Sequence, residues 1–578
     1  MTHTFRVWTP AAQRVDVEVR GSRHALLNDE WGWWQTDVSD AGPGDDYWFR
    51  IDGGDALPDP RSAFQPAGVH GPSRIVDHSA YSWNDGDWRG FALRDAVIYE
   101  LHTGTFTEAG TFDGVGERLD HLVQLGVNAI ELMPIGEFSG TRGWGYDGVN
   151  LFAPHHAYGG PEGLKRLVDL CHARGLAVLI DVVYNHVGPE GNYLGMFGPY
   201  FTNRYATPWG DAINYDGPDC DEVRAFVVDN ALMWLRDYHC DGLRLDAVHE
   251  IVDTSATHIQ EEVVTRVEAL RDKLGRELWV IAESDSNDPR LVRDRVLGGY
   301  GVHAQWSDNF HHALHALLTG ERNGYYVDFG SPNDVCTALR QAFVYTGQYS
   351  RFRRRRFGRP VGELPLHRFL GYAQNHDQVG NRAAGDRLSH IVSPGRVRIA
   401  AALAVLSPFV PLVFQGEEWA ASTPFQYFTD FGDPALQKAV SAGRRREFRQ
   451  FGWSADQVPD PTALETFTRS RLRWDELSQR DHAAMLDWYT ALIALRQATP
   501  RLRESLPATV RAWHDDDRSL LFYENAGLLM VCNLGAVPAD VIEASELPLV
   551  LSSSLLDNRA GGWRCPVDTV AIWSRDDG

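Results

Sequence analysis

Four segments of the sequence end an apolar run in a cluster of polar side chains whose types could do chemistry. The segments are residues 180–186, 242–246, 279–283 and 373–377, and each contains a carboxylate. Pairs of aspartate and glutamate side chains are the groups that hydrolyse glycosidic bonds. In a parallel α/β barrel the reacting groups come from the carboxyl ends of several strands. The four clusters therefore favour one catalytic site shared by four strand ends.

Two of these carboxylates have surroundings that suit different steps of one reaction. Strand alternation places Arg244 and Asp246 on the same side, and a neighbouring arginine keeps an aspartate ionised, as a nucleophile at a sugar anomeric carbon must be. Glu283 follows the apolar residues 280–282. Apolar surroundings raise a carboxyl pKa, which suits a general acid. As an alternative, any one of these carboxylates could form an ion pair that closes the barrel end.

The elements that must position these residues alternate along the chain. Eight apolar runs of strand length are separated by longer segments with helical spacing, a pattern typical of parallel strands joined by helices. Apolar residues between Ile259 and Leu274, for example, line one face of a helix. Eight such units over roughly 400 residues predict an α/β fold, a (β/α)8 TIM barrel. The predicted strands are 97–101, 129–133, 177–183, 243–246, 278–282, 302–306, 369–373 and 412–414.

The length of 578 residues exceeds what one core can organise, so further domains are expected around the barrel. Residues 1–90 carry short alternating runs cut by glycine and proline, which predicts a small all-β domain. The barrel domain is predicted at 94–500, with a long insertion at about 188–218 after the third strand. Residues 505–578 return to short β-type runs and predict a C-terminal β-domain.

The composition narrows the possible partners and compartments. The chain has 55 basic and 78 acidic side chains, a formal net charge of −23. The negative electrostatic field of this charge repels phosphate backbones and anionic lipids, so neither nucleic acid nor a membrane is an expected partner. The six cysteines form no CxxC pair, and the N-terminus lacks a basic segment followed by an apolar one. We therefore expect a cytoplasmic protein.

Several other motifs carry little functional weight. Residues 143–148 match GxGxxG but do not lie between a strand and a helix, which argues against dinucleotide binding. None of the three lysines follows a glycine, so there is no Walker A loop. His311 and His315 have the spacing of two metal ligands on one helix, but a third ligand would have to come from elsewhere, and a helix surface or barrel rim is favoured. The basic run 351–356 is interpreted as a solvated loop, with contact to sugar hydroxyls or to a domain interface as alternatives.

In order and spacing, the four clusters resemble the four signature regions of the α-amylase family, glycoside hydrolase family 13. The resemblance implies a retaining glycoside hydrolase in which Asp246 is the nucleophile, Glu283 the general acid and base, and Asp377 the transition-state stabiliser. It also implies residues that bind the glucosyl unit at the cleavage point; these are Tyr146, Asp147, His186, Arg244 and His376. We expect neither a cofactor nor a metal ion.

Wider stretches resemble one group within that family, the enzymes that hydrolyse maltooligosyltrehalose next to its trehalose end. They lie at residues 97–107, 209–214, 304–308, 374–382 and 416–419. The resemblance also covers an N-terminal β-sandwich similar to glycogen-binding modules. It implies maltooligosyltrehalose and malto-oligosaccharides as ligands. The maltooligosyltrehalose synthase that builds the trehalose end is implied as a functional partner, with no need for physical contact.

One position departs from many α-amylases. Where they carry Lys-His after the nucleophile, this chain has His249 and Glu250. Because those residues usually face the acceptor sugar, we expect His249 to contact it, in an enzyme that recognises trehalose rather than maltose beyond the cleaved bond. Glu417 and Glu418 are further acceptor-side candidates.

Three alternatives remain open at this point. A glycogen branching enzyme would share the β-sandwich and the three carboxylates but pass the glycosyl group to a sugar 6-hydroxyl. A non-catalytic glycan-binding relative would have lost those carboxylates, which are all present here. A metal-dependent barrel hydrolase could use a set of aspartates and histidines, but the arginine beside the nucleophile fits neutral-sugar chemistry better; that set is Asp181, His186, Asp246 and His376.

Overall fold

A closed parallel barrel of eight strands forms the centre of the computed structural model, which describes residues 2–449, 453–454, 457–559 and 561–575. The predicted (β/α)8 fold is confirmed, and each predicted strand overlaps one of the observed strands. In order around the barrel they are β12 (Ala177–Val182), β15 (Gly242–Leu245), β16 (Trp279–Ala282), β17 (Ala304–Trp306), β20 (Phe369–Gly371), β21 (Val410–Phe414), β8 (Ile98–Leu101) and β9 (Ala129–Leu132).

The barrel interior changes from apolar to charged along the strands. Ile98, Leu179 and Ile281 belong to one buried apolar cluster inside the barrel. Because strand side chains alternate, the residue two positions further along each strand points the same way. Glu100 and Asp181 occupy two of these positions, and Glu283 follows the third strand. The charged groups therefore gather at the carboxyl ends of the strands, above an apolar floor.

Helices and short connections surround the barrel. The helix predicted from its apolar face is α7, and it ends at Gly275, which adopts a φ of +61° that favours glycine. The α-helices are α1 (Thr103–Phe106), α2 (Phe112–Gly116), α3 (Leu119–Leu125), α4 (Gly160–His172), α5 (Leu194–Phe197), α6 (Cys220–Arg236), α7 (Ile259–Leu274), α8 (Asp308–Thr319), α9 (Pro332–Gln341), α10 (His376–Gly380), α11 (Leu388–Ile391), α12 (Pro394–Val405), α13 (Pro434–Arg449), α14 (Leu464–Arg469) and α15 (Arg480–Ala498).

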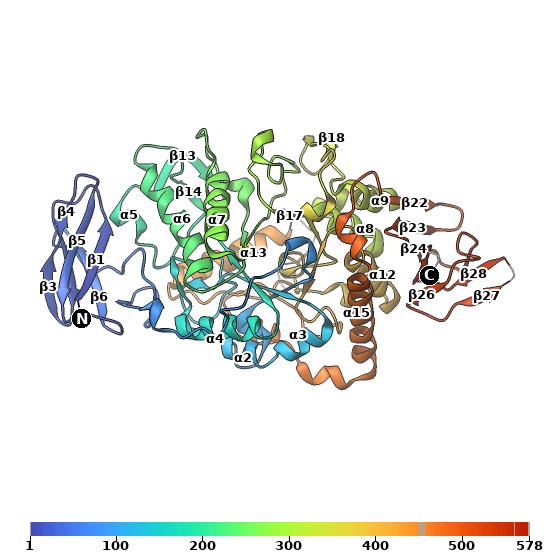
Figure 1. Ribbon diagram of the computed structural model, residues 1–578, viewed down its shortest axis with the longest axis horizontal. Helices are drawn as coiled ribbons and strands as arrows, with labels where there is room; N and C mark the ends of the chain where they lie inside the picture. Colours follow the sequence, from blue (N-terminus) through green and yellow to red (C-terminus); the bar gives the residue numbers. More distant parts are fainter. Residues whose placement is uncertain (1, 450–452, 455–456, 560, 576–578) are drawn as a thin grey trace.

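Antiparallel sheets lie at both ends of the elongated molecule, with the barrel between them (Figure 1). The N-terminal sheets have the orders β1-β5-β4 and β3-β2-β6-β7, and the C-terminal sheets β22-β23-β24-β29-β26 and β25-β28-β27. The N-terminal strands are β1 (Thr2–Trp8), β2 (Val15–Val19), β3 (Ser22–Ala25), β4 (Leu27–Asn28), β5 (Trp33–Ser39), β6 (Asp46–Ile51) and β7 (Ser73–Arg74). The C-terminal strands are β22 (Arg511–Asp515), β23 (Leu520–Asn525), β24 (Leu528–Asn533), β25 (Ala539–Val541), β26 (Leu549–Ser552), β27 (Asp557–Arg559), β28 (Gly562–Cys565) and β29 (Thr569–Ser574).

Three antiparallel hairpins extend from the barrel. The insertion after the third strand, expected only as a long loop, contains α5 and the hairpin of β13 (Phe201–Thr207) and β14 (Gly210–Ile213). The others pair β10 (Gly136–Glu137) with β11 (Asn150–Pro154), and β18 (Thr346–Ser350) with β19 (Arg355–Gly358). The basic run 351–356 forms the turn and part of the second strand of the last hairpin. Within the described residues, no helix is both long and apolar enough to cross a membrane.

The segment that enters the barrel is attached to its amino-terminal end by a buried ion-pair network. His172 lies between two carboxylates, with Nδ1 at 2.9 Å from Asp85 and Nε2 at 2.9 Å from Asp241. Trp88 stacks on the His172 ring and donates its indole N–H to Asp241 at 2.7 Å. Burial lowers the pKa of His172, but Asp241 and Asp85 outweigh it and raise the pKa. The charged imidazole therefore joins the segment around residues 83–91 to the barrel.

We expect His172→Gln to lower the stability by about 3 kcal/mol, because it leaves buried Asp241 without its counter-charge, while Asp85 keeps His239 at 2.8 Å. Since the folded-state pKa is raised, the histidine stabilises the fold fully below its unfolded pKa of about 6.5 and loses that effect as the pH rises through the folded-state pKa. The melting-temperature difference between His172→Gln and the wild type should thus be larger at pH 6 than at pH 9. An equal difference at both pH values would contradict the ion-pair account, and the exposed His70→Gln serves as the control.

Candidate active site

A cavity of about 530 Å³ at the carboxyl ends of the strands brings together most of the residues predicted from the sequence. Arg244 lies buried beside them, with its side chain 1% exposed. The predicted residues that line the cavity are Tyr146, Asp147, His186, Asp246, His249, Glu283, His376 and Asp377. The four strand-end clusters thus form one site.

The Arg244 guanidinium holds three carboxylates together. Its Nη1 donates to Asp181 at 2.8 Å and to Asp246 at 2.9 Å, while Nη2 donates to Glu283 at 2.9 Å. The guanidinium also lies 4.2 Å from the centre of the Trp306 ring. Because its donors lie in a fixed plane, this one side chain fixes the relative positions of the carboxylates on three neighbouring strands.

The surroundings of Asp246 favour its ionised form. Burial raises the pKa of Asp246, but Arg244 and then His186 outweigh that effect and lower the pKa. The Asn185 amide also donates to Oδ2 of Asp246 at 2.7 Å. A carboxylate that is charged, fixed and turned to the cavity is equipped to attack an electrophilic carbon.

Glu283 has the opposite protonation preference. Burial raises its pKa well above the ordinary value; Arg244 opposes this shift, and the negative charges of Asp246 and Asp377 add to it. The Ala247 backbone N–H donates at 2.8 Å to Glu283 Oε2, the same oxygen that accepts from Arg244. Two neighbouring carboxyl groups with separated pKa values can divide the roles of acid and nucleophile.

A series of hydrogen bonds links Tyr146 to Glu100 on β8. The Tyr146 hydroxyl donates to Asp181 at 2.6 Å and lies 2.7 Å from His376 Nε2. His376 Nδ1 contacts Glu100, whose other oxygen accepts the His376 backbone N–H at 3.0 Å. Burial lowers the pKa of His376, but the charge of Glu100 outweighs it and raises the pKa. These hydrogen bonds fix the Tyr146 ring, which stacks on the His376 imidazole at the wall of the cavity.

The third strand and the insertion supply another wall. His186 contacts the Asn185 side chain and donates from Nε2 to the Tyr146 carbonyl at 2.9 Å. Its ring stacks on Trp209, with ring centres 4.1 Å apart and planes 5° apart. Trp209 comes from the β13–β14 hairpin and is 49% exposed. Trp209 belongs to the stretch 209–214, which carries part of the family resemblance, but it is not one of the predicted site residues.

The loops beside Glu283 form a small charged network. Asp285 Oδ1 lies 3.8 Å from His249 Nε2, and Asp285 Oδ2 forms an ion pair with Arg353 Nη2 at 2.7 Å. The basic run is therefore not only a solvated loop, because Arg353 contacts the segment that follows the predicted general acid. The Arg353 side chain is 18% exposed and lies 3.9 Å from the centre of the Phe357 ring.

Other cavity residues were not predicted. Trp144, Ala247 and Pro208 adjoin residues already discussed, and Asn381 lies four residues after Asp377 within the stretch 374–382. Three come from segments with no predicted site residue: Tyr427, Arg444 and Glu447. The glycine-rich stretch before Tyr146 gave one signal, since Gly145 has a φ of +98° and an added Cβ would lie 2.0 Å from the Pro134 carbonyl.

The structure does not bring Glu417 into this cavity. The Tyr489 hydroxyl of α15 donates to Glu417 at 2.6 Å, and the Glu417 side chain is buried. Burial raises the pKa of Glu417 to about 7. Glu418 accepts the Tyr99 hydroxyl at 2.9 Å and contacts His121. Both glutamates join structural elements rather than facing the catalytic candidates.

One group of described side chains has ligand atoms close enough together to hold a metal ion. The atoms of Glu137, His155 and His156 lie within 4.8 Å of one another. Glu137 already accepts the His156 backbone N–H at 2.9 Å and its Nδ1 at 2.7 Å. His155 Nδ1 accepts from the Ala157 backbone N–H, so the proton of the neutral ring is on Nε2, which cannot then ligate a metal. The group is a hydrogen-bond network.

The histidine pair on α8 is likewise committed to hydrogen bonds. His311 is 1% exposed, not at the helix surface; Nδ1 donates to the Ala373 carbonyl at 2.7 Å and Nε2 lies 3.0 Å from Tyr326. His315 pairs with Glu321 at 2.8 Å. The pair therefore supports the loop before Asp377 from behind.

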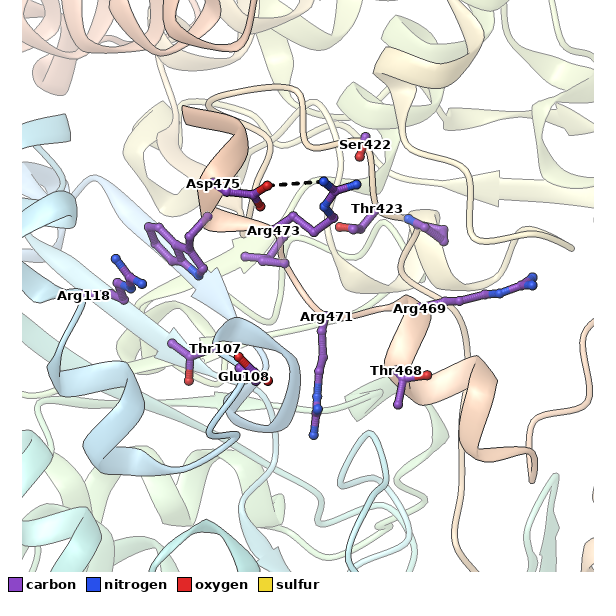
Figure 2. Close-up of a pocket in the computed structure, with 13 residues that line it drawn as sticks. Thr107, Glu108, Arg118, Ser422, Thr423, Thr468, Arg469, Arg471, Arg473 and Asp475 are labelled. Carbon is purple, nitrogen blue, oxygen red and sulfur yellow. Dashed lines mark hydrogen bonds and ion pairs between the residues drawn. The ribbon is translucent and has the colours of Figure 1, made fainter. Parts of the chain in front are cut away.

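A second cavity of about 650 Å³ contains none of the catalytic candidates (Figure 2). Its four arginine side chains point in different directions rather than toward one point (Figure 2). Each has its own contact: Arg473 with Asp475, Arg469 with Glu465, Arg118 with the Trp474 ring and Arg471 with the Phe467 ring. The larger cavity is therefore not the candidate active site.

Comparison with known proteins agrees with this geometry. The family model described as alpha amylase, catalytic domain, matches residues 80–205. A malto-oligosyltrehalose trehalohydrolase from Arthrobacter ramosus is 52% identical over 505 residues, which cover 86% of this chain and 88% of the relative. The chain belongs to the malto-oligosyltrehalose trehalohydrolase family, within the α-amylase family. It is thus a member of a family of glycoside hydrolases.

Two further comparisons define this membership. A solved structure from Salmonella typhimurium, described as a "Putative alpha Amylase", has a TM-score of 0.91 and 36% identity, and the match covers 99% of this chain and 98% of that chain. A 1,4-alpha-glucan branching enzyme from Pseudoalteromonas atlantica is 30% identical, but over only 54% of this chain and 49% of its own. Similarity to the trehalohydrolase family is stronger and extends over more of the chain.

We expect Arg244→Lys to lower kcat/KM for hydrolysis by about 10²-fold or more, because lysine cannot hold three carboxylates in one plane. Weakening the counter-charge raises the pKa of Asp246. Since Asp246 must be ionised to act, the acid limb of the kcat/KM profile should move to higher pH. Measuring kcat/KM from pH 3 to 9 tests both effects, with the exposed Arg236→Lys as control. An unshifted acid limb would show that Arg244 does not set the charge of Asp246.

Proposed function

We propose that this chain hydrolyses the α-1,4-glucosidic bond next to the trehalose end of maltooligosyltrehalose and releases trehalose and a shortened malto-oligosaccharide. The observation that carries this proposal is the relation to a named trehalohydrolase over 86% of the chain, together with three carboxylates that line one cavity at the strand ends. The chemistry is that of a retaining glycoside hydrolase.

In the first step Asp246 attacks the anomeric carbon while Glu283 protonates the leaving oxygen, so the trehalose unit departs and a glycosyl ester forms on Asp246. The charged Asp246 and the protonated Glu283 begin in the forms that this step needs. Both groups accept from the same Arg244 guanidinium, which supports the short carboxyl separation of about 5–5.5 Å of retaining enzymes.

In the second step Glu283, now ionised, removes a proton from water, and the water oxygen attacks the same anomeric carbon from the side that trehalose left. The ester to Asp246 breaks, Asp246 regains its charge, and the proton returns Glu283 to its starting form. Two inversions at one carbon give net retention of configuration.

We assign the third carboxylate and the cavity walls to the sugar at the cleavage point. Asp377 binds its 2- and 3-hydroxyls, with contacts that tighten as the ring flattens toward the oxocarbenium ion. Tyr146 provides the stacking surface beneath the ring. Further hydrogen bonds to this sugar are assigned to Asp147, His186, Arg244 and His376.

Recognition of the trehalose end is assigned to the loops beside Glu283. His249 faces Asp285, which Arg353 holds at 2.7 Å. These side chains offer both donors and acceptors to the hydroxyls of a second sugar. A polar network of fixed geometry can distinguish an α,α-1,1-linked glucose from an α-1,4-linked one, because the two linkages present hydroxyls at different positions.

The same proposal defines the partner and the compartment. The substrate is supplied by maltooligosyltrehalose synthase, which acts upstream without any required contact. The six cysteines, none of them paired in the structure, and the net charge of −23 support a cytoplasmic protein that binds neutral sugars rather than nucleic acid.

We expect Asp246→Asn and Glu283→Gln each to lower kcat by about 10³-fold or more. A substrate with a fluoride leaving group separates their roles, because fluoride departs without protonation. With α-maltotriosyl fluoride, Glu283→Gln should form and accumulate a glycosyl ester on Asp246, detectable by mass spectrometry, while Asp246→Asn should form none. Full activity of Asp246→Asn would contradict the nucleophile assignment.

Product analysis tests the substrate. Incubation with maltooligosyltrehalose should release free trehalose, whereas plain amylose should change little under the same conditions. Trehalose production would locate specificity beyond the cleaved bond. If amylose instead gained α-1,6 branches and no trehalose appeared, the barrel and carboxylates would still be explained, but the protein would be a branching enzyme.

A further inference from the structure

Asp377 differs from the other two catalytic candidates in what holds it in place. Asp246 and Glu283 both accept from Arg244 inside the barrel. Asp377 lies on α10, and among the described residues one side chain is found to donate to its carboxylate. That donor is Asn381, whose Nδ2 lies 2.7 Å from Asp377 Oδ1, one helical turn further along.

Asn381 is held in turn by a residue from a distant helix. The Arg444 Nη2 of α13 donates to Asn381 Oδ1 at 2.8 Å and to the Gly380 carbonyl, the last residue of α10, at 2.8 Å. The Arg444 side chain is 12% exposed and lies between two aromatic rings, 4.7 Å from the centre of Tyr427 and 4.6 Å from that of Phe448. A long flexible side chain is thereby fixed.

We propose that Asn381 and Arg444 form a positioning chain that holds the Asp377 carboxylate in the orientation needed at the transition state. The inference rests on the role proposed above for Asp377. Neither Asn381 nor Arg444 needs to touch the reacting atoms; each acts through the carboxylate.

The direction of the hydrogen bonds supports this role. Arginine can only donate, so Arg444 requires the carbonyl oxygen of the Asn381 amide to face it. The amide hydrogens must then face Asp377, which when ionised can only accept. Arg444 thus selects one of the two amide orientations, the one that holds Asp377. Arg444 is also ion-paired with Glu447 at 3.2 Å, so the orientation of the amide, rather than the charge of Arg444, is its main effect on Asp377.

A purely structural account is that Arg444 only attaches α13 to α10. The two accounts differ for Asn381→Asp. This variant keeps an acceptor for Arg444, even as a direct ion pair, so the attachment of α13 should be preserved. It also replaces the donor that faces Asp377 by a second carboxylate, which would repel the Asp377 side chain. Attachment of α13 alone predicts unchanged activity for this variant, whereas the positioning role predicts a loss.

We expect Asn381→Ala to lower kcat for maltooligosyltrehalose by about 10- to 100-fold with KM within about 3-fold, since contacts that tighten in the transition state affect kcat. Asn381→Asp should lose at least as much. Arg444→Met should resemble Asn381→Ala, and the double variant should be no worse than the worse single variant, because the two residues act in series. Arg446→Met, an exposed arginine on the same helix, should keep wild-type kcat.

The outcomes separate this inference from the proposed function. If Asp377→Asn abolishes activity but Asn381→Asp keeps at least half of the wild-type kcat, the positioning chain is wrong while the role of Asp377 stands. Losses of Asn381→Ala and Arg444→Met that multiply in the double variant would also overturn the chain. If Asp377→Asn itself keeps full kcat, the proposed role of Asp377 fails. Melting temperatures of all variants within a few degrees of the wild type establish that kcat reports on folded protein.

Discussion

The site depends on one buried cation that is shared by three carboxylates. Arg244 contacts Asp181, Asp246 and Glu283, so three ionised groups around this one cation would leave an excess negative charge at the largely buried strand ends. At least one carboxyl must therefore keep a proton. Burial raises the pKa of Glu283 well above its ordinary value and that of Asp181 to about 6, whereas Arg244 and His186 lower the pKa of Asp246 against the effect of burial. The unequal sharing of one positive charge gives chemically similar side chains the opposite protonation preferences that the proposed acid and nucleophile need.

The barrel is what makes this sharing possible. Removing several charges from water costs several kcal/mol per ion, and the attraction between them offsets this cost only when their geometry is nearly ideal. Parallel strands in fixed register provide that geometry. Asp181 lies directly beside Arg244 across β12 and β15, with tightly packed apolar residues below. A shift by one residue would turn these side chains away from the interior. The strands that position the catalytic groups cannot change register without losing the site.

Strand-level features were predictable from the sequence because they repeat at short range. Apolar runs and alternation indicated all eight strands and the inward direction of Arg244 and Asp246. Features that depend on contacts between distant segments were not predictable: Trp209 meets His186 across an inserted hairpin, and Arg444 reaches Asn381 from a helix more than 60 residues later. The prediction for Glu417 placed it on the acceptor side, but the chain turns after β21 and directs this side chain to Tyr489. Sequence position alone does not give the direction of a side chain beyond the last strand residue.

The site has two layers, which differ in the structural elements that hold their residues in place. Asp246 and Glu283 are held by strands and by Arg244. Asp377, Trp209, His249 and Arg353 are held by a short helix, two hairpins and a loop, the elements to which we assign contacts with the sugar and its leaving group. Loops can vary without disturbing the strand register, whereas the strands cannot. A fold arranged in this way can keep one bond-breaking step while its loops select which sugar leaves and which acceptor enters. Related enzymes can therefore share the carboxylates and form different products.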